Sequence, residues 1–238
     1  MGTIIDKYIK VITDWQQQIV DSNLSKELLE ILDRGLWMCG NNPKNGIIIS
    51  GINPSFKPEI PREYNDTIPF ALCSGRYWDP LKKLVGEFLK TGNVGYIDLF
   101  PLRVSKQDHE FEKYVPTDLK AAILRVTQNE IEQLAPKLII YANSTSRYYW
   151  GTDTEHPWMG YQLTQMPLPS SLQGKGVLYH IDGMLDSDQK ILPLKDTALK
   201  GSYLFICPFQ SGGRCRIPSE RKLVEEDIKQ LWEIANNK

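Results

Sequence analysis

The stretch Gly46-Ile-Ile-Ile-Ser-Gly-Ile-Asn-Pro-Ser55 decides the fold class of this chain. It is short, rich in β-branched residues and bounded by turn residues, and it is apolar on both faces. Such a run is typical of a strand buried in the centre of a parallel sheet, whereas a half-exposed strand alternates apolar and polar residues. We therefore predict a central strand that ends in a loop from Gly51 to Ser55.

Other short apolar runs alternate with helical patterns along the chain. The predicted strands cover residues 94–100, 137–142 and 203–207. The predicted helices, in which apolar residues recur at intervals of three and four, cover residues 79–90, 117–134 and 219–235. Strands that alternate with helices indicate an α/β fold, in which ligands bind at the carboxyl ends of the parallel strands.

Two segments do not fit this alternation. Residues 1–45 are predicted to form an N-terminal helical flank, with one helix over residues 4–20 and a second capped by Asn23 or Ser25. Residues 153–200 hold short apolar pieces broken by Gly, Pro and Asp, which predict hairpins or an irregular insert. Because 238 residues can bury one sizeable core, we expect a single domain over the whole chain, residues 1–238.

The composition excludes several classes of protein. Hydrophobic residues make up 41% of the chain, too many for a disordered protein, and no segment reaches the roughly 20 apolar residues that cross a bilayer. The 28 basic and 29 acidic residues leave a net charge of -1, so nucleic-acid binding would depend on a local basic patch. The first residues carry acids and Trp15 where a secretory signal is apolar, so we expect a cytoplasmic protein.

The cysteines give no sign of a metal site. Cys39, Cys73, Cys207 and Cys215 are scattered along the chain without a C-x-x-C pair. This spacing argues against a zinc knuckle or an iron–sulfur loop. We predict reduced thiols that are buried or half-buried, no metal, no cofactor and a monomer.

The loops that follow the predicted strands carry the first candidate functional residues. Gly51 permits close approach of the backbone, and Asn53 offers both a donor and an acceptor in a turn stiffened by the next proline. Phe70, in the element Pro69-Phe-Ala71, could serve as a platform on which a base stacks. The simpler interpretations are an ordinary Asn-Pro turn and an aromatic cluster that seals the core.

Two later segments, a strand and a loop, contribute acidic and basic candidate residues. Asp98 lies in an otherwise apolar strand, where an unpaired carboxylate is costly to bury, so it either reads a ligand or accepts bonds from backbone amides. The loop from Cys207 to Pro218 places Arg214 and Arg216 near two glycines, and its backbone amides could grip a phosphate. A flexible loop with a solvated run of charge is the simpler interpretation of that segment.

Together these segments resemble the uracil-DNA glycosylase superfamily, most closely its mismatch-specific uracil/thymine branch. The shared elements are GINPS at 51–55, PFA and RYW within 69–78, the strand at 94–103, PKLIIYANS at 136–144 and SGGRCR before the last helix. The resemblance covers residues 46–152 and 203–236. It implies a three-layer α/β/α sandwich around a mostly parallel sheet of four or five strands, to which the N-terminal helices and the insert are added.

The resemblance also implies roles for residues of this chain. Asn53 would hold the water that attacks the anomeric carbon of the sugar, and Phe70 would stack on a base flipped out of the duplex. The implied substrate-binding residues are Gly51, Ile52, Phe70, Asp98 and Asn143. The implied DNA-binding loop, which enters the minor groove, consists of Ser211, Gly212, Gly213, Arg214 and Arg216.

Two hypotheses of function follow. The first is a monofunctional DNA glycosylase that hydrolyses the N-glycosidic bond of a flipped-out damaged or deaminated base. The second is a catalytically silent member of the same fold that binds nucleic acid, a nucleotide or a protein partner. Asp98 stands where the family commonly has Asn or Lys, and an ionised carboxylate only accepts hydrogen bonds, so a base edge with N–H donors would suit it better than uracil. A small-molecule α/β hydrolase has no support, since no G-x-S-x-G element is present.

Overall fold

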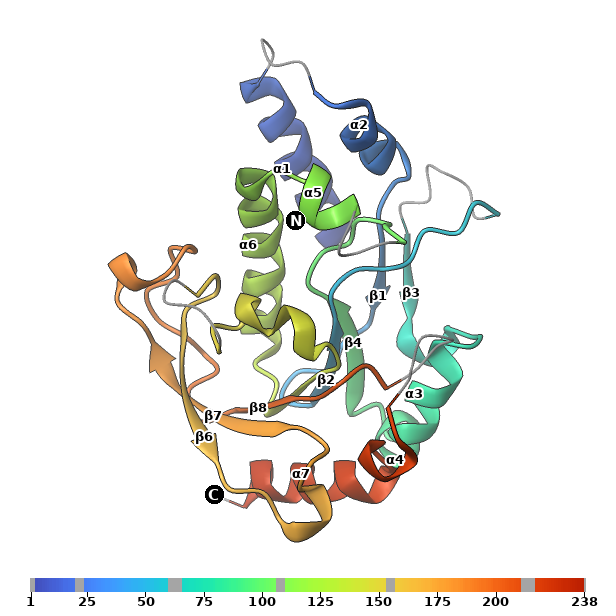
Figure 1. Ribbon diagram of the computed structural model, residues 1–238, viewed down its shortest axis with the longest axis vertical. Helices are drawn as coiled ribbons and strands as arrows, with labels where there is room; N and C mark the ends of the chain where they lie inside the picture. The colour runs from blue at the N-terminus through green and yellow to red at the C-terminus, as the bar shows by residue number, and fades with distance from the viewer. Residues whose placement is uncertain are drawn as a thin grey trace. The chain divides into compact units, whose positions relative to one another are not determined.

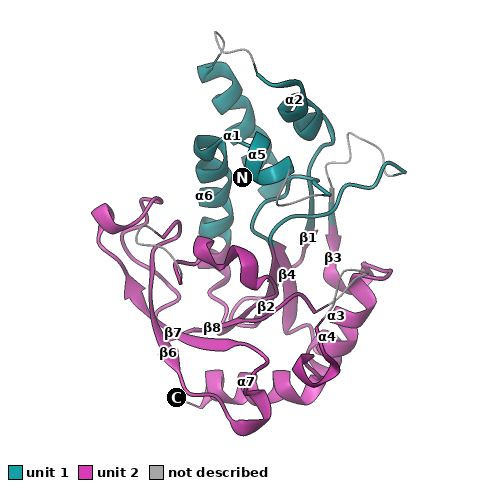
Figure 2. Cartoon of the chain, in the orientation of Figure 1, with its two compact units in different colours: residues 1–38, 52–67, 98–130 teal, residues 39–51, 68–97, 131–238 magenta. Residues whose placement is uncertain are grey.

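The computed structural model describes residues 3–19, 24–59, 66–105, 110–152, 157–210 and 217–237 (Figure 1). The chain forms two compact units, each assembled from three separate stretches (Figure 2). Unit 1 comprises residues 1–38, 52–67 and 98–130, and unit 2 comprises residues 39–51, 68–97 and 131–238. The expectation of a single domain stays a prediction.

Unit 2 is built on a six-stranded sheet with the strand order β4-β2-β5-β8-β7-β6. Its strands are β2 (Ile47–Gly51), β4 (Val94–Asp98), β5 (Leu138–Tyr141), β6 (Tyr161–Met166), β7 (Val177–Met184) and β8 (Tyr203–Ile206). Strands β2, β5 and β8 run parallel, and β7 and β6 continue the sheet antiparallel. Every residue of β2, β4, β5 and β8 is buried, as the apolar runs predict.

The α/β class predicted from the sequence is confirmed, but the sheet has six strands rather than four or five. The extra strands come from the insert at residues 153–200, where β6 and β7 form a hairpin that pairs with β8. Hairpins were one of the two outcomes predicted for this segment. In β7 only Leu178 and Ile181 are buried, so the strand lacks the continuous apolar run that marks the central strands.

The helices of unit 2 include α3 (Trp78–Leu84), α4 (Gly86–Lys90) and α7 (Glu225–Asn236). The single helix predicted over residues 79–90 is wrong, because it breaks at Val85, whose φ of -116° and ψ of 25° leave the helical region. The last helix begins at Glu225 rather than at Ser219, which instead opens the short 3-10 turn Ser219–Arg221. Helix α7 packs against β5 and α3.

Unit 1 is mainly helical. Its helices are α1 (Ile4–Gln18), α2 (Lys26–Asp33), α5 (Glu112–Tyr114) and most of α6 (Thr117–Leu134). Helix α6 has the bounds predicted from its apolar spacing. Ser25, one of the two predicted caps of α2, accepts a hydrogen bond from the Leu28 amide at 3.2 Å, while Asn23 lies outside the described residues.

The N-terminal flank is not helical throughout. Residues 37–40 form strand β1 (Trp37–Gly40), which pairs with β3 (Asp66–Pro69) in a second, two-stranded sheet. The prediction of a helical flank over residues 1–45 is therefore wrong for this segment. A four-residue strand next to the turn cluster Gly40-Asn-Asn-Pro-Lys-Asn-Gly46 is too short to show a period of its own.

Within the described part of the chain, no helix combines the length and the apolar character needed to span a bilayer. Nor do the described side chains gather three or more His, Cys, Asp or Glu residues in a way that could hold a metal ion.

Candidate functional site

The carboxyl ends of the parallel strands in unit 2 meet at one edge of the sheet. Ser50 lies opposite Tyr141, and Tyr141 lies opposite Ile206. The Ala142 amide donates a hydrogen bond to the Ser50 carbonyl at 3.0 Å, and the Cys207 amide donates one to the Tyr141 carbonyl at 3.0 Å. The three strands therefore end at the same level. The structure thus brings the ends of β2, β5 and β8 together, as the parallel topology predicts.

Two predicted site residues of unit 2 lie at these strand ends. Gly51 is the last residue of β2, and Asn143 comes two residues after β5. The Asn143 side chain is buried, and its Oδ1 accepts a hydrogen bond from Thr145 Oγ1 at 2.7 Å. Asn143 is therefore held as a local turn residue, and its predicted contact with substrate stays a prediction.

In unit 1 the loop after β2 lies beside the segment after β4. The Phe100 amide donates to the Ile52 carbonyl at 2.8 Å, and the Val104 amide donates to the Pro54 carbonyl at 2.9 Å. These bonds pair residues 52–54 with residues 100–104. Asn53 therefore lies next to the backbone that follows Asp98, although about fifty residues separate the two segments in the sequence.

The amide nitrogen of Asn53 is fully engaged by backbone carbonyl groups. Nδ2 donates to the carbonyl oxygens of Val104 at 2.8 Å, Pro54 at 3.0 Å and Leu102 at 3.3 Å. Three acceptors around one NH2 group fix which end of the amide is nitrogen, because an oxygen placed there would face three other oxygens. The orientation of the Asn53 side chain is thereby determined.

The amide oxygen of Asn53 is in the opposite situation. Asn53 is only 7% exposed, yet its Oδ1 has no hydrogen-bond partner among the described residues. Buried polar atoms are nearly always satisfied, and leaving one without a partner costs about 1–3 kcal/mol. A buried, immobilised acceptor that the described residues leave without a partner is suited to a small donor from outside the chain, such as the O–H of a water molecule.

Arg103, which sequence reasoning did not single out, fastens the loop that carries Asn53. The guanidinium is 2% exposed and donates to the carbonyls of Arg34 at 2.8 Å and Lys57 at 3.3 Å. The ring of Phe56 lies under both guanidinium groups, 4.6 Å from that of Arg34 and 5.4 Å from that of Arg103, and Arg34 also pairs with Glu110 at 2.9 Å. An arginine inside the apolar run Phe100-Pro-Leu-Arg-Val104 was the signal available in the sequence.

Asp98, the last residue of β4, is buried and belongs to unit 1. Its charge acts on Tyr8, whose hydroxyl shares a 2.7 Å hydrogen bond with Thr127 Oγ1, which donates to the Leu99 carbonyl at 2.7 Å. Burial raises the pKa of Tyr8 far above its usual value, the Thr127 hydrogen bond opposes this, and the charges of Glu130 and Asp98 raise it further. Tyr8 therefore stays a neutral phenol beside this strand end.

Phe70 lies in an aromatic cluster of unit 2. Its ring stacks on Tyr96 with centroids 5.8 Å apart and meets the edge of Trp78 at 6.1 Å. Tyr77 closes the cluster, with its hydroxyl 2.5 Å from that of Tyr96. Phe70 is only 3% exposed, which favours the sealing of the core over a ring presented to a base. The sealing of the core was the simpler interpretation that the sequence offered for this element.

The thiol of Cys207 lies at the strand end of β8 and is not a nucleophile. Burial raises its pKa to about 12, an effect that a hydrogen bond with Gln210 partly offsets. The same Gln210 accepts from the Leu223 amide at 2.9 Å and donates to the Pro208 carbonyl at 2.8 Å, which ties the chain before residue 211 to the start of α7. At neutral pH Cys207 is a neutral buried thiol, as the sequence predicts.

The predicted DNA-binding loop, made of Ser211, Gly212, Gly213, Arg214 and Arg216, lies outside the described residues. Its role stays a prediction.

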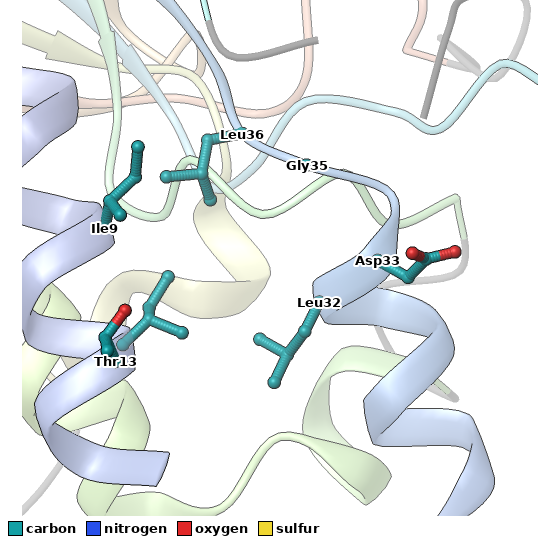
Figure 3. A pocket seen from close by; sticks show the side chains of 7 residues that line it. Ile9, Thr13, Leu32, Asp33, Gly35 and Leu36 are labelled. Carbon is teal, nitrogen blue, oxygen red and sulfur yellow. The ribbon is translucent and has the colours of Figure 1, made fainter. Parts of the chain in front are cut away.

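A shallow pocket of about 230 Å³ lies elsewhere in unit 1 (Figure 3). It is lined by Ile9, Ile12, Thr13, Leu32, Asp33, Gly35 and Leu36. None of the residues predicted from the sequence borders it, and its lining offers only one hydroxyl and one carboxylate. This pocket is therefore not the candidate site.

No protein-family model matches this chain, and no curated protein matches it significantly. The sequence motifs and the geometry of Asn53 are therefore the features of this chain that point to a function.

Proposed function

We propose that this protein is a monofunctional DNA glycosylase, which hydrolyses the N-glycosidic bond of a damaged or deaminated base flipped out of DNA. The observation that carries the proposal is the side chain of Asn53. Its Nδ2 is held by three backbone carbonyls, and its buried Oδ1 has no partner among the described residues. A fixed acceptor of this kind is suited to holding the hydrolytic water, which is the role that the family resemblance implies for Asn53.

In the proposed reaction Asn53 Oδ1 accepts one O–H of a water molecule and so directs a lone pair of that water towards the anomeric carbon. The bond between this carbon and the base nitrogen breaks, and its electron pair leaves with the base. The sugar passes through an oxocarbenium-like state, as in glycoside hydrolysis generally. The water oxygen then bonds to carbon, and its proton passes through solvent to the departing base.

An amide is a very weak base, so Asn53 contributes by orientation rather than by removing the proton. Positioning a nucleophile in a near-attack geometry lowers the barrier without any change of protonation. Stabilisation of the negative charge that develops on the base supplies much of the rest in such reactions. Bases that leave readily, such as deaminated bases, are therefore the expected substrates of a site without a strong general base.

Asp98 narrows the choice of base. The ionised carboxylate is acceptor-only, so it would repel the O4 oxygen of uracil and favour a base edge that presents N–H donors. We therefore expect uracil to be a poor substrate. The three-layer sandwich of that family and the entry of the loop at residues 211–216 into the minor groove belong to the same proposal.

The test is a cleavage assay on the full chain. Fluorescent duplex and single-stranded oligonucleotides carrying uracil, a G·T mismatch, hypoxanthine or xanthine are incubated with the protein and treated with alkali, which cleaves at abasic sites. We expect strand breaks at one or more lesions, and a loss of rate of about 10²-fold or more for Asn53→Ala, as for other groups that position or stabilise reacting atoms. Ser55→Ala is the matched control, because Ser55 is an exposed residue of the same loop.

Three outcomes decide the proposal. Breaks that disappear with Asn53→Ala but persist with Ser55→Ala support the proposed reaction. Breaks that persist with Asn53→Ala contradict the role of this residue. If no lesion is cut although labelled oligonucleotides are retained at low salt, the chain is a catalytically silent nucleic-acid-binding member of the fold.

A further inference from the structure

Two cysteines that are far apart in the sequence meet inside unit 2. The sulfur atoms of Cys39 and Cys73 are 3.7 Å apart, although 34 positions separate the residues along the chain. Cys39 lies in strand β1, and Cys73 directly follows the 3-10 turn Phe70–Leu72. Both are buried, and both sulfur atoms belong to the same compact unit. The two thiols are in van der Waals contact, close enough that a small movement would bring them to bonding distance.

Cys73 is held in place by backbone bonds on one side and borders an exposed segment on the other. Its amide donates to the Phe70 carbonyl at 3.2 Å, and its sulfur lies 3.6 Å from the Pro69 carbonyl oxygen. Its neighbour Leu72 is 72% exposed, and Ser74 is exposed as well. Phe70 anchors the start of the turn in its aromatic cluster, whereas the residues on either side of Cys73 are exposed. A local opening at residues 72–74 would give solvent access to Cys73 without unfolding of the sheet.

We propose that Cys39 and Cys73 form a redox-active pair, which a small-molecule disulfide such as glutathione disulfide oxidises to an intramolecular disulfide. The Cys73 thiolate attacks one sulfur of glutathione disulfide and releases one glutathione thiol. Cys39 then attacks the mixed disulfide, forms the Cys39–Cys73 bond and releases the second glutathione. The two cysteines lose two electrons and two protons, and the oxidant gains both.

The pair differs from the other described cysteine. Cys207 has Gln210 as its partner rather than a second sulfur, and burial holds it in the neutral thiol form. An intramolecular disulfide needs two sulfurs at close range, which Cys39 and Cys73 alone provide among the described cysteines. Cys207 is therefore the internal control for the proposal, which does not depend on the proposed glycosylase activity.

The experiment is a peptide map of the oxidised full-length protein. The reduced native protein is equilibrated with glutathione disulfide, denatured in the presence of N-ethylmaleimide, digested with trypsin and analysed by mass spectrometry. Tryptic cleavage places Cys39 in the peptide 35–44 and Cys73 in the peptide 63–76. We expect these two peptides to be joined with the loss of two hydrogen atoms, and to separate again after reduction with dithiothreitol.

The variants distinguish this bond from other thiol chemistry. The cross-linked peptide should persist in Cys207→Ser and Cys215→Ser and be absent from Cys39→Ser and Cys73→Ser. The proposal is overturned if both wild-type peptides are recovered with N-ethylmaleimide attached. It is equally overturned if Cys39 and Cys73 are found bonded to Cys215 or to glutathione in preference to each other.

Discussion

The nitrogen and the oxygen of the Asn53 amide have different surroundings. One substitution, Asn53→Asp, tests which end of the amide is the nitrogen. Asn53→Asp keeps the size of the side chain but places a carboxylate oxygen against the carbonyls of Pro54, Leu102 and Val104. Several lost hydrogen bonds and the repulsion between oxygens should lower the free energy of unfolding by about 2–4 kcal/mol at neutral pH. Urea denaturation measures this loss.

The control for this prediction is again Ser55→Ala, which should change the stability by less than about 0.5 kcal/mol because the residue is exposed. An Asn53→Asp variant as stable as the wild type would contradict the orientation that we assign to the amide.

The raised pKa of Cys207 predicts how the free energy of unfolding changes at alkaline pH. Its pKa is raised to about 12 in the folded chain, whereas an unfolded cysteine titrates near 8.5. Between these values the unfolded chain has lost the proton and the folded chain retains it, so the free energy of unfolding falls by about 1.4 kcal/mol per pH unit from this residue alone. Below the unfolded pKa the contribution to stability is complete.

The measurement compares urea denaturation of the wild type and of Cys207→Ala between about pH 8 and pH 11. The variant is expected to be less stable throughout because of the cavity it creates, but its stability should fall less steeply with pH. If the free energies of unfolding of the two proteins fell equally with pH, the raised pKa that we give to Cys207 would be wrong.

At the scale of elements, a buried ion pair connects the insert to the last helix. The carboxylate of Asp227 in α7 accepts hydrogen bonds from Lys175 Nζ, at 2.7 and 2.8 Å, and from the Val224 amide, at 2.8 Å. Lys175 lies in the connection between β6 and β7. Asp227→Asn keeps the cap at Val224 but leaves the charge of Lys175 without its partner, and it should lower the free energy of unfolding by about 1–3 kcal/mol.

The neighbouring Glu226 provides the control for this prediction. Its side chain is 68% exposed and lies 4.0 Å from Lys229, so Glu226→Gln should have almost no effect on thermal or urea denaturation. Equal stability losses for Asp227→Asn and Glu226→Gln would mean that the pair with Lys175 contributes nothing specific.

The proposed disulfide also has a consequence for the elements it joins. A bond between Cys39 and Cys73 would close a loop with a sequence separation of 34 residues and link β1 to the turn after β3. In the chain-entropy description such a loop stabilises the folded state by about 3–4 kcal/mol. The oxidised protein should therefore melt several degrees above the reduced one, and calorimetry with and without dithiothreitol measures the difference.

The elements that the sequence predicted best are those with a long or uniform pattern. The fully buried strands β2, β4, β5 and β8 stand out as apolar runs, and α6 repeats its apolar positions over five turns. The break at Val85 and the short strand β1 have no such signal, because a single residue or four residues cannot show a period. The hairpin β6–β7 joins the sheet through pairing with β8, which depends on tertiary structure rather than on its own sequence.

For the whole molecule, the motif revealed Asn53 as a candidate, but its surroundings could not be foreseen. The carbonyl groups that orient it come from Leu102 and Val104, about fifty residues further along the chain. Arg103, at the end of the shared element 94–103, and Tyr8, outside the shared elements, were not singled out. The sequence indicated an aromatic cluster at Phe70, but its burial against Tyr96 comes from the packing of unit 2.

The central claim is that Asn53 Oδ1 orients a hydrolytic water, and single-turnover cleavage of the preferred lesion duplex tests it most directly. The wild type and Asn53→Ala are compared at saturating protein and at a temperature at which urea denaturation shows both to be folded, with duplex affinity measured in parallel by fluorescence anisotropy. We predict a rate that is about 10²-fold or more lower for Asn53→Ala with nearly unchanged affinity, because the lost group acts on the water rather than on the DNA. An equal rate for the two proteins, or no cleavage of any lesion by the wild type, would contradict it.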